Sequence, residues 1–341
     1  MISNFSKLGL NISEKQYRQL PHLSYSILAK YAREGFEGYL HLNDDEESES
    51  LTFGSVLDCL ITEPKQFDER FKVVDCKVTG KIKDVLDYVL EKHYEDRSDD
   101  ISSVTKQEYI EAFANCEFYP NLKLETKLLK FQNDDAKLYY KEKQCARGKQ
   151  VITTEVFDDA TNTANALKYD RYIGRFFADY TKDPFMESIY QLKLQAKIGS
   201  YIYKCMIDLL IIDHSKKMIF PIDLKSSSKP EYEFAKSFSY WRYDIQARLY
   251  WSILNTVVVH SKDFCDYTIA DYTFIVINKK SLNPLVWTFK HTKDQGDIVI
   301  GDKTYESPFS IAGKLKPLIE NNATMPLEIK KNKPNVIEDF I

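Results

Sequence analysis

Two apolar segments joined by a short polar turn place the strongest constraint on how this chain can fold. Residues Tyr201–Ile212 and Met218–Leu224 are rich in Ile, Leu, Tyr and Met, and the intervening Asp213–Lys217 is polar. Apolar runs of this length that flank turn residues predict two strands of a hairpin. Because the apolar residues are nearly continuous, both faces of these strands are expected to be buried in a larger sheet.

Two acids and a lysine interrupt these apolar strands. If the turn is centred near Ser215, Asp208 lies almost opposite Pro221–Ile222, one or two positions from Asp223. Neighbouring strands then hold the two carboxylates within about 5–8 Å of each other. Asp223 and Lys225 are two residues apart, so a strand points both side chains to the same side. Such a group is costly to bury without a partner, and a divalent metal supplies one.

The order Asp, then Asp-X-Lys, on a hairpin resembles the PD-(D/E)XK nuclease superfamily. Three further segments are similar to the phage and RecB-type exonucleases, in particular the exonuclease VIII (RecE) group. These are Leu23–Leu28, Leu51–Pro64 and Gln246–Tyr250, the last resembling a Gln-X-X-X-Tyr helix. The resemblance covers roughly residues 15–290. It implies a restriction-endonuclease-like α/β core, with a central mixed sheet flanked by helices and an N-terminal helical wall.

The chain departs from the family pattern at two positions. Ile207 precedes Asp208 where the superfamily name has proline, at a place that varies. Asp58 stands where exonuclease VIII-like proteins usually carry a metal-binding histidine. Because Mg²⁺ prefers oxygen ligands, an acid is chemically acceptable there. We interpret Asp58 as an exchanged ligand, and the alternative is an exposed or N-capping aspartate.

The resemblance implies a site for Mg²⁺, with Mn²⁺ as a substitute. The expected ligands are Asp208, Asp223, the main-chain carbonyl of Leu224, and Asp58. Glu187, at the start of the first core strand, is a further candidate for the metal or a phosphate, and a surface acid at a strand edge is the alternative.

Three more residues receive catalytic roles from the same resemblance. Lys225 would orient or deprotonate the attacking water, and we expect desolvation and a nearby cation to lower its pKa. Gln246 would hold that water or a phosphate oxygen, and Tyr250 would contact the backbone or brace Lys225. An ordinary surface ion pair is the alternative for Asp223 and Lys225, and plain helix packing for Gln246 and Tyr250.

Composition excludes several classes of protein. The six cysteines are scattered without a Cys-X-X-Cys pair, which argues against a disulfide scaffold, a zinc site and an iron–sulfur cluster. The chain shows no apolar run long enough to span a bilayer and no signal-peptide pattern, so we expect no membrane contact and a bacterial cytoplasmic location, phage- or prophage-encoded. Because the net charge is −4, DNA binding would need basic residues concentrated in one groove.

We expect residues 1–341 to form one elaborated nuclease domain. Its parts are N-terminal helices with Asp58 (15–71), a variable helical insertion (72–150), the nuclease core (151–322) and a polar tail (323–341). The lysines of the insertion form either a DNA-facing patch or a solvated surface with acids interspersed. Within the core we predict a strand at Glu187–Ala196, one long helix at Tyr232–Leu254, and a strand pair at Tyr272–Asn278 and Leu285–Phe289.

The sequence and its resemblance together predict a Mg²⁺-dependent exonuclease that degrades double-stranded DNA, 5′ to 3′, and produces single strands for recombination or repair. The resemblance also implies a homo-oligomer, a trimeric or tetrameric ring. It further suggests an annealing or single-strand-binding partner, for which the acidic and apolar end Pro334–Ile341 is a candidate peptide. The alternatives are a structure-selective endonuclease in phage defence or counter-defence, and a DNA-binding subunit with a silent site.

Overall fold

The computed structural model describes residues 5–41, 49–75, 78, 80–92, 98–146, 148–178, 180, 183–227 and 229–320. The chain is an α/β protein with a mixed central sheet, many helices and a helical N-terminal region, as expected. It divides into two compact units, residues 1–47 with 166–341 and residues 48–165. None of the described helices is long and apolar enough to cross a membrane. The tail predicted at 323–341, with its candidate peptide, lies outside the described residues.

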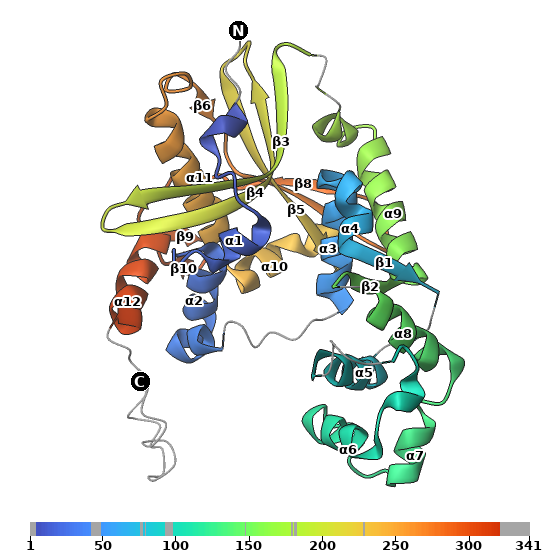
Figure 1. Ribbon diagram of the computed structural model, residues 1–341. Helices are drawn as coiled ribbons and strands as arrows, with labels where there is room; N and C mark the ends of the chain where they lie inside the picture. Colours follow the sequence, from blue (N-terminus) through green and yellow to red (C-terminus); the bar gives the residue numbers. More distant parts are fainter. Residues whose placement is uncertain are drawn as a thin grey trace, which may run out of the picture. The chain divides into compact units, whose positions relative to one another are not determined.

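A six-stranded sheet forms the centre of the first unit (Figure 1). Its order is β3–β4–β5–β7–β8, and the short β6 pairs with β5. β3, β4 and β5 form an antiparallel meander, β5 runs parallel to β6 and β7, and β8 is antiparallel to β7. The strands are β3 (Met186–Ile198), β4 (Tyr201–Asp213), β5 (Met218–Ser227), β6 (Thr268–Ile269), β7 (Thr273–Asn278) and β8 (Leu285–Thr288).

The helix α11 (Tyr243–Val259) packs on β3 and β4 and supplies much of the apolar core of this unit. Ile245, Leu249 and Ile253 are fully buried at helical spacing, so one side of α11 closes over the sheet. α2 and α12 pack beside it. The remaining elements of the unit are η1 (Phe5–Leu8), α1 (Glu14–Gln19), α2 (Tyr25–Leu40), η4 (Gly174–Phe177), η5 (Glu231–Glu233), α10 (Phe234–Trp241), β9 (Ile298–Ile300), β10 (Lys303–Tyr305) and α12 (Pro308–Glu320).

The second unit has its own core of apolar side chains, drawn from residues 74–151. Its strands β1 and β2 are parallel, and Phe71 pairs with Gln150 at one end of the ladder. The elements are α3 (Glu49–Thr62), η2 (Pro64–Gln66), α4 (Phe67–Arg70), β1 (Phe71–Val74), α5 (Gly80–Lys92), η3 (Ile101–Ser103), α6 (Lys106–Asn115), α7 (Leu124–Leu129), α8 (Asp134–Cys145), β2 (Gln150–Thr153) and most of α9 (Thr154–Tyr169).

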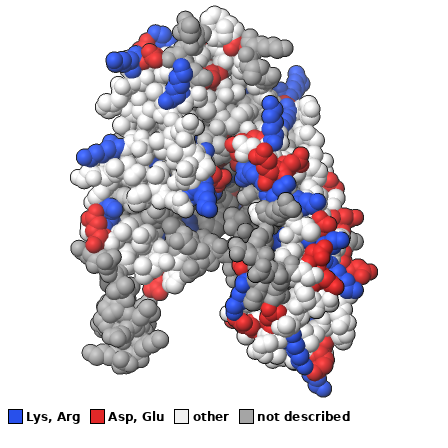
Figure 2. Space-filling view, viewed as in Figure 1, with Lys and Arg blue, Asp and Glu red and all other residues white. Residues whose placement is uncertain are grey.

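Basic and acidic side chains are interspersed over the second unit on the face shown in Figure 2. Lysines of this unit also form ion pairs with its acids, since Lys83 and Lys143 both contact Asp87, at 2.6 and 2.8 Å. On this face the lysines therefore form a mixed, solvated surface and not a basic patch.

Several predicted boundaries differ from the structure. The expected insertion 72–150 belongs to a wider unit, residues 48–165. In that unit α3, η2 and α4 contact one another, and α4 contacts β1. The long helix predicted at Tyr232–Leu254 is broken, since Arg242 adopts a left-handed conformation with φ 57° between α10 and α11. In the N-terminal helical region, α2 begins after Ser24, which makes no side-chain capping hydrogen bond, and the helix is kinked at Gly35. The strands predicted at Glu187–Ala196 and Tyr272–Asn278 are confirmed.

Candidate functional site

The site lies where β4 parts from β5. The ladder between these strands runs from Asp213–Met218 to Leu209–Ile222 and stops there. β3 and β4 bend sharply about halfway along their length (Figure 1). The pairing of β3 with β4 is interrupted at the same place, at Gln191, which has φ 51°. Irregular residues of this kind commonly end strand pairing and redirect side chains, and here the result is a fork in the sheet.

Asp208 is the first residue of β4 beyond the end of this ladder. Continuing the observed register places it directly opposite Asp223, one position further along β5 than the turn centre at Ser215 predicted. Leu224 lies beyond the end of the ladder, so its N–H donates to a side chain, Asp208 Oδ2, at 2.9 Å. The N–H and C=O of one strand residue point to the same side, so the Leu224 carbonyl also faces the fork.

Asp223 is the most deeply buried acid of the site, with 1% of the residue exposed. Gln246 Nε2 donates to its Oδ1, and Lys225 Nζ lies 2.7 Å from its Oδ2. The carboxylate therefore holds one helix residue and one strand residue in place. The cation and the amide offset part of the cost of burying this charge, while Oδ2 makes no hydrogen bond within the described residues.

Lys225 is a buried cation whose surroundings favour the charged form. Burial lowers its pKa, but the carboxylates of Asp223 and Asp208, with two tyrosines, act in the opposite direction, and the pKa is raised well above its ordinary value. Without a cation beside it, the two acids therefore outweigh desolvation, and the expectation of a lowered pKa next to a bound cation stays a prediction. The ammonium also lies 4.8 Å from the ring centre of Tyr243. Tyr243, which the sequence did not single out for this role, is the aromatic residue that braces Lys225.

Tyr243, Gln246 and Tyr250 lie on one face of α11, at spacings of three and four residues. Tyr250 packs against Tyr272 with ring centres 6.1 Å apart, and burial raises the pKa of both tyrosines. Within the part of the chain that the structure describes, Gln246 Oε1 and Tyr272 Oη are buried without a hydrogen-bond partner. Buried polar atoms of this kind beside a carboxylate indicate room for water or a ligand atom.

Of the two other predicted metal ligands, Glu187 belongs to the same sheet as Asp208, and Asp58 belongs to the second unit. Glu187 pairs with Ile212, four strand residues from Asp208, so the two are about 13 Å apart along the strand. Its carboxylate instead contacts His214 Nε2 and the Phe5 N–H, each at 3.3 Å. Glu187 therefore contacts residues at the turn end of the hairpin and does not lie beside Asp208. Asp58 lies half-buried on α3 of the second unit, and its part in the site stays a prediction.

The donor set suits a hard cation with few protein ligands. Among the described residues no three His, Cys, Asp or Glu side chains cluster as a metal-binding group. Mg²⁺, however, is usually held by one or two carboxylates and keeps several waters. Asp208, Asp223 and the Leu224 carbonyl together match that requirement.

No protein-family model matches this chain, and no curated protein matches it. Among solved structures, it is similar to a crystal structure of a presumed exonuclease from Eubacterium rectale. The two chains share 12% identity, with 97% of this chain and 98% of the other covered and a TM-score of 0.40. At so low a TM-score we infer neither fold nor activity from this likeness.

Proposed function

We propose that this chain is a metal-dependent deoxyribonuclease of the PD-(D/E)XK type, acting as an exonuclease on double-stranded DNA. The observation that carries the proposal is that Asp208 Oδ2 accepts from the Leu224 N–H at 2.9 Å, next to Asp223, whose Oδ2 lies 2.7 Å from Lys225 Nζ. The Gln246 contact with Asp223 supports it, because it joins the helix of the Gln-X-X-X-Tyr resemblance to the same carboxylate.

Formal charge explains why this group of residues needs a cation. Two carboxylates and one ammonium leave the fork with a net negative charge, which repels a phosphodiester. Asp208, Asp223, the Leu224 carbonyl and, as a proposal, Asp58 would hold Mg²⁺. When bound, the ion would lower the pKa of a coordinated water and neutralise charge on the scissile phosphate.

The protein side chains position the reacting groups. Lys225, fixed by Asp223 and by the Tyr243 ring, can direct its ammonium to the phosphate and stabilise the charge that develops in the transition state. Gln246 has its Oε1 buried and unpartnered among the described residues, so this atom can accept a hydrogen bond from an attacking water. Because Gln246 Nε2 is already bonded to Asp223, the amide orientation is fixed before substrate binds.

Direction and assembly are proposed from the family resemblance. The exonuclease would run 5′ to 3′ and leave single strands for recombination, handed to an annealing or single-strand-binding partner. A ring of three or four copies would enclose the duplex. Such a channel would gather the basic residues that a chain of net charge −4 needs around DNA.

Digestion of linear and circular duplexes tests the proposal. Each linear duplex carries a label at one end, and reactions contain Mg²⁺, Mn²⁺ or EDTA. We expect loss of linear duplex with either metal, none with EDTA, and intact circles. Lys225→Ala and Asp223→Ala should each lower the rate by at least about a hundredfold, or about 3 kcal/mol of barrier. Lys216→Ala is the matched control, because this exposed lysine lies at the hairpin turn.

Each alternative gives a different outcome. Cleavage of circles would indicate an endonuclease. Metal-independent DNA binding without cleavage would indicate a silent site. Wild-type rates in Lys225→Ala, with Lys216→Ala equally active, would show that the fork is not the catalytic centre.

A further inference from the structure

An exposed pair of aromatic residues ends α10. Tyr240 and Trp241 are 66% and 44% exposed, and their rings meet edge to face with centres 4.8 Å apart. The Arg33 guanidinium lies 4.8 Å from the Trp241 ring centre, and it also contacts Glu34 at 3.2 Å. Single exposed aromatics are ordinary, but two adjacent rings with a stacked guanidinium form a surface suited to a flat, anionic ligand.

This surface is connected to the catalytic fork by direct contacts. Tyr25 Oη donates to the Trp241 carbonyl at 2.8 Å, and the Tyr25 ring lies 6.1 Å from the Tyr243 ring. Tyr243 in turn covers the ammonium of Lys225. A ligand on Trp241 would therefore lie next to the residues that surround Lys225.

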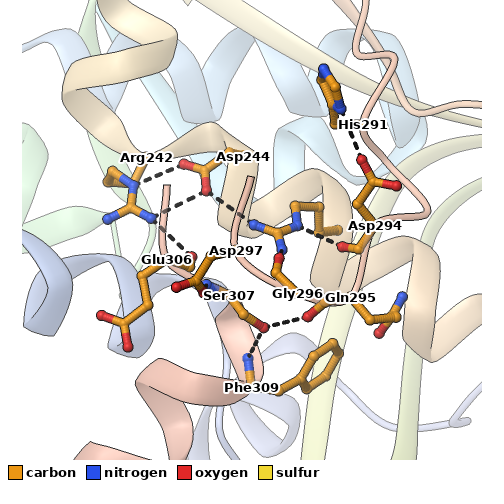
Figure 3. Close-up of polar contacts among 11 residues, drawn as sticks. Arg242, Asp244, His291, Asp294, Gln295, Gly296, Asp297, Glu306, Ser307 and Phe309 are labelled. Atoms are coloured by element: carbon orange, nitrogen blue, oxygen red, sulfur yellow. Dashed lines mark hydrogen bonds and ion pairs between the residues drawn. The ribbon is translucent and has the colours of Figure 1, made fainter. Parts of the chain in front are cut away.

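The corner between α10 and α11 is held in a costly conformation. Arg242 has φ 57°, a region that non-glycine residues avoid because Cβ crowds the backbone. Its guanidinium donates to both Asp244 oxygens, at 2.9 and 3.2 Å, and to the Glu306 carbonyl at 3.2 Å. Figure 3 shows Arg242 and Asp244 meeting in this network, which continues to the Asp294–Gly296 segment. The corner, joined to Asp244 and Glu306 by these hydrogen bonds, directs Trp241 to the surface and Tyr243 to Lys225.

We propose that Tyr240, Trp241 and Arg33 form a stacking platform for the unpaired bases of single-stranded DNA beside the Lys225 site. Aromatic side chains stack on any base, so such a platform binds strands without sequence preference, and arginine adds attraction to bases and phosphates. A duplex buries its base faces, whereas a frayed or overhanging end exposes them. This assignment rests on the proposed function and extends it to the strand that the site receives.

Binding measured in EDTA tests the platform without cleavage. Fluorescence anisotropy would measure the binding of three labelled DNAs: a short single strand, a duplex with a single-stranded overhang, and a duplex whose two ends are both closed by loops. We expect Trp241→Ala to weaken binding of the first two by roughly tenfold, and Trp241→Phe to restore most of it, since stacking contributes on the order of a tenfold factor per base. The closed duplex should be bound equally by all variants. Phe185→Ala is the control, because this 55% exposed aromatic lies at the turn end of the hairpin, where its carbonyl accepts from His214 N–H.

The outcomes separate the platform from the nuclease. Unchanged single-strand affinity in Trp241→Ala, with intact digestion by the wild type, would overturn the platform and leave the nuclease proposal standing. A Trp241-dependent affinity in a protein that digests nothing would keep the platform and remove the nuclease. If Trp241→Ala instead changed the mass measured by light scattering and left DNA affinity unchanged, the surface would be a contact between copies. Thermal melting of Trp241→Ala, measured beside Trp241→Phe and the wild type, shows whether any loss in the alanine variant reflects unfolding.

Discussion

Within the described residues, the Gln246 side chain makes a hydrogen bond through one atom of its amide and none through the other. Its Nε2 is committed to Asp223, and its Oε1 is buried without a partner. We expect Gln246→Leu to lower turnover at least about tenfold while changing the free energy of unfolding by less than about 1 kcal/mol. The lost bond to Asp223 destabilises the variant, but removal of an unsatisfied buried oxygen offsets this. Rates and thermal unfolding measured beside Asn255→Leu, a half-buried position on the same helix, check the prediction. Wild-type turnover in the leucine variant would place Gln246 outside the catalytic group.

Asp58 is the residue whose role depends most on the resemblance. If it is a ligand, Asp58→His should retain partial activity and shift the metal preference towards Mn²⁺, because imidazole is a softer donor than carboxylate. Asp58→Ala should cost far more, since it removes the ligand. Titrations of rate against Mg²⁺ and Mn²⁺ for both variants would show the difference. Equal, wild-type-like rates in both would mean that Asp58 does not touch the metal.

At the scale of elements, the Asp213 carboxylate stabilises the turn between β4 and β5. Asp213 accepts from Ser215 Oγ at 2.6 Å and from Lys216 N–H at 3.0 Å. The Ser215 bond, with the bonds and charge of Lys216, lowers the pKa of Asp213 from 3.8 to about 2. A lowered pKa means that this contribution to stability is full above about pH 4 and is lost as the pH falls through about 2.

We therefore expect Asp213→Asn to lower the free energy of unfolding at pH 7 by about 1–2 kcal/mol, since hydrogen bonds to charged groups are stronger than those between neutral groups. The difference should shrink below pH 4 and vanish near pH 2. Urea unfolding across this pH range measures it. A difference independent of pH would show that the ionised carboxylate does not stabilise the turn.

Local patterns in the sequence predict the hairpin and its acids well, because both depend on alternation and spacing within one or two strands. The register was missed by one position, since the pattern around Ser215 does not fix the turn centre to within one residue. The break at Arg242 has no sequence signal, because an arginine in a left-handed conformation depends on Asp244 and Glu306. The resemblance offered Tyr250 either as a contact for the DNA backbone or as a brace for Lys225. The residue whose ring lies 4.8 Å from the Lys225 ammonium is instead Tyr243, the first residue after the break.

At the scale of the whole molecule, the residues that the structure describes form two apolar cores. The core of the first unit draws on both its N-terminal helices and its sheet, from Phe5 to Leu315, whereas that of the second lies wholly within residues 74–151. The second core includes a group of aromatic rings, in which Phe118 contacts Phe113 and Phe131 with centres 5.0 and 5.3 Å apart. A unit with its own core and closed by the β1–β2 pair meets the physical requirement for independent folding.

We predict that residues 48–165, produced alone, fold cooperatively. Phe118 is fully buried in their core, so Phe118→Ala in this fragment should lower its stability by about 3–5 kcal/mol through the cavity it leaves. Leu129→Ala is the control, because Leu129 is 61% exposed. Thermal unfolding followed by circular dichroism would show one sharp transition, lowered strongly by the first substitution and little by the second. A gradual, non-cooperative loss of signal would instead mean that this unit needs the rest of the chain in order to fold. In that case a loss of activity in Asp58→Ala could arise through unfolding, and its interpretation as a lost metal ligand would require the melting curve of that variant.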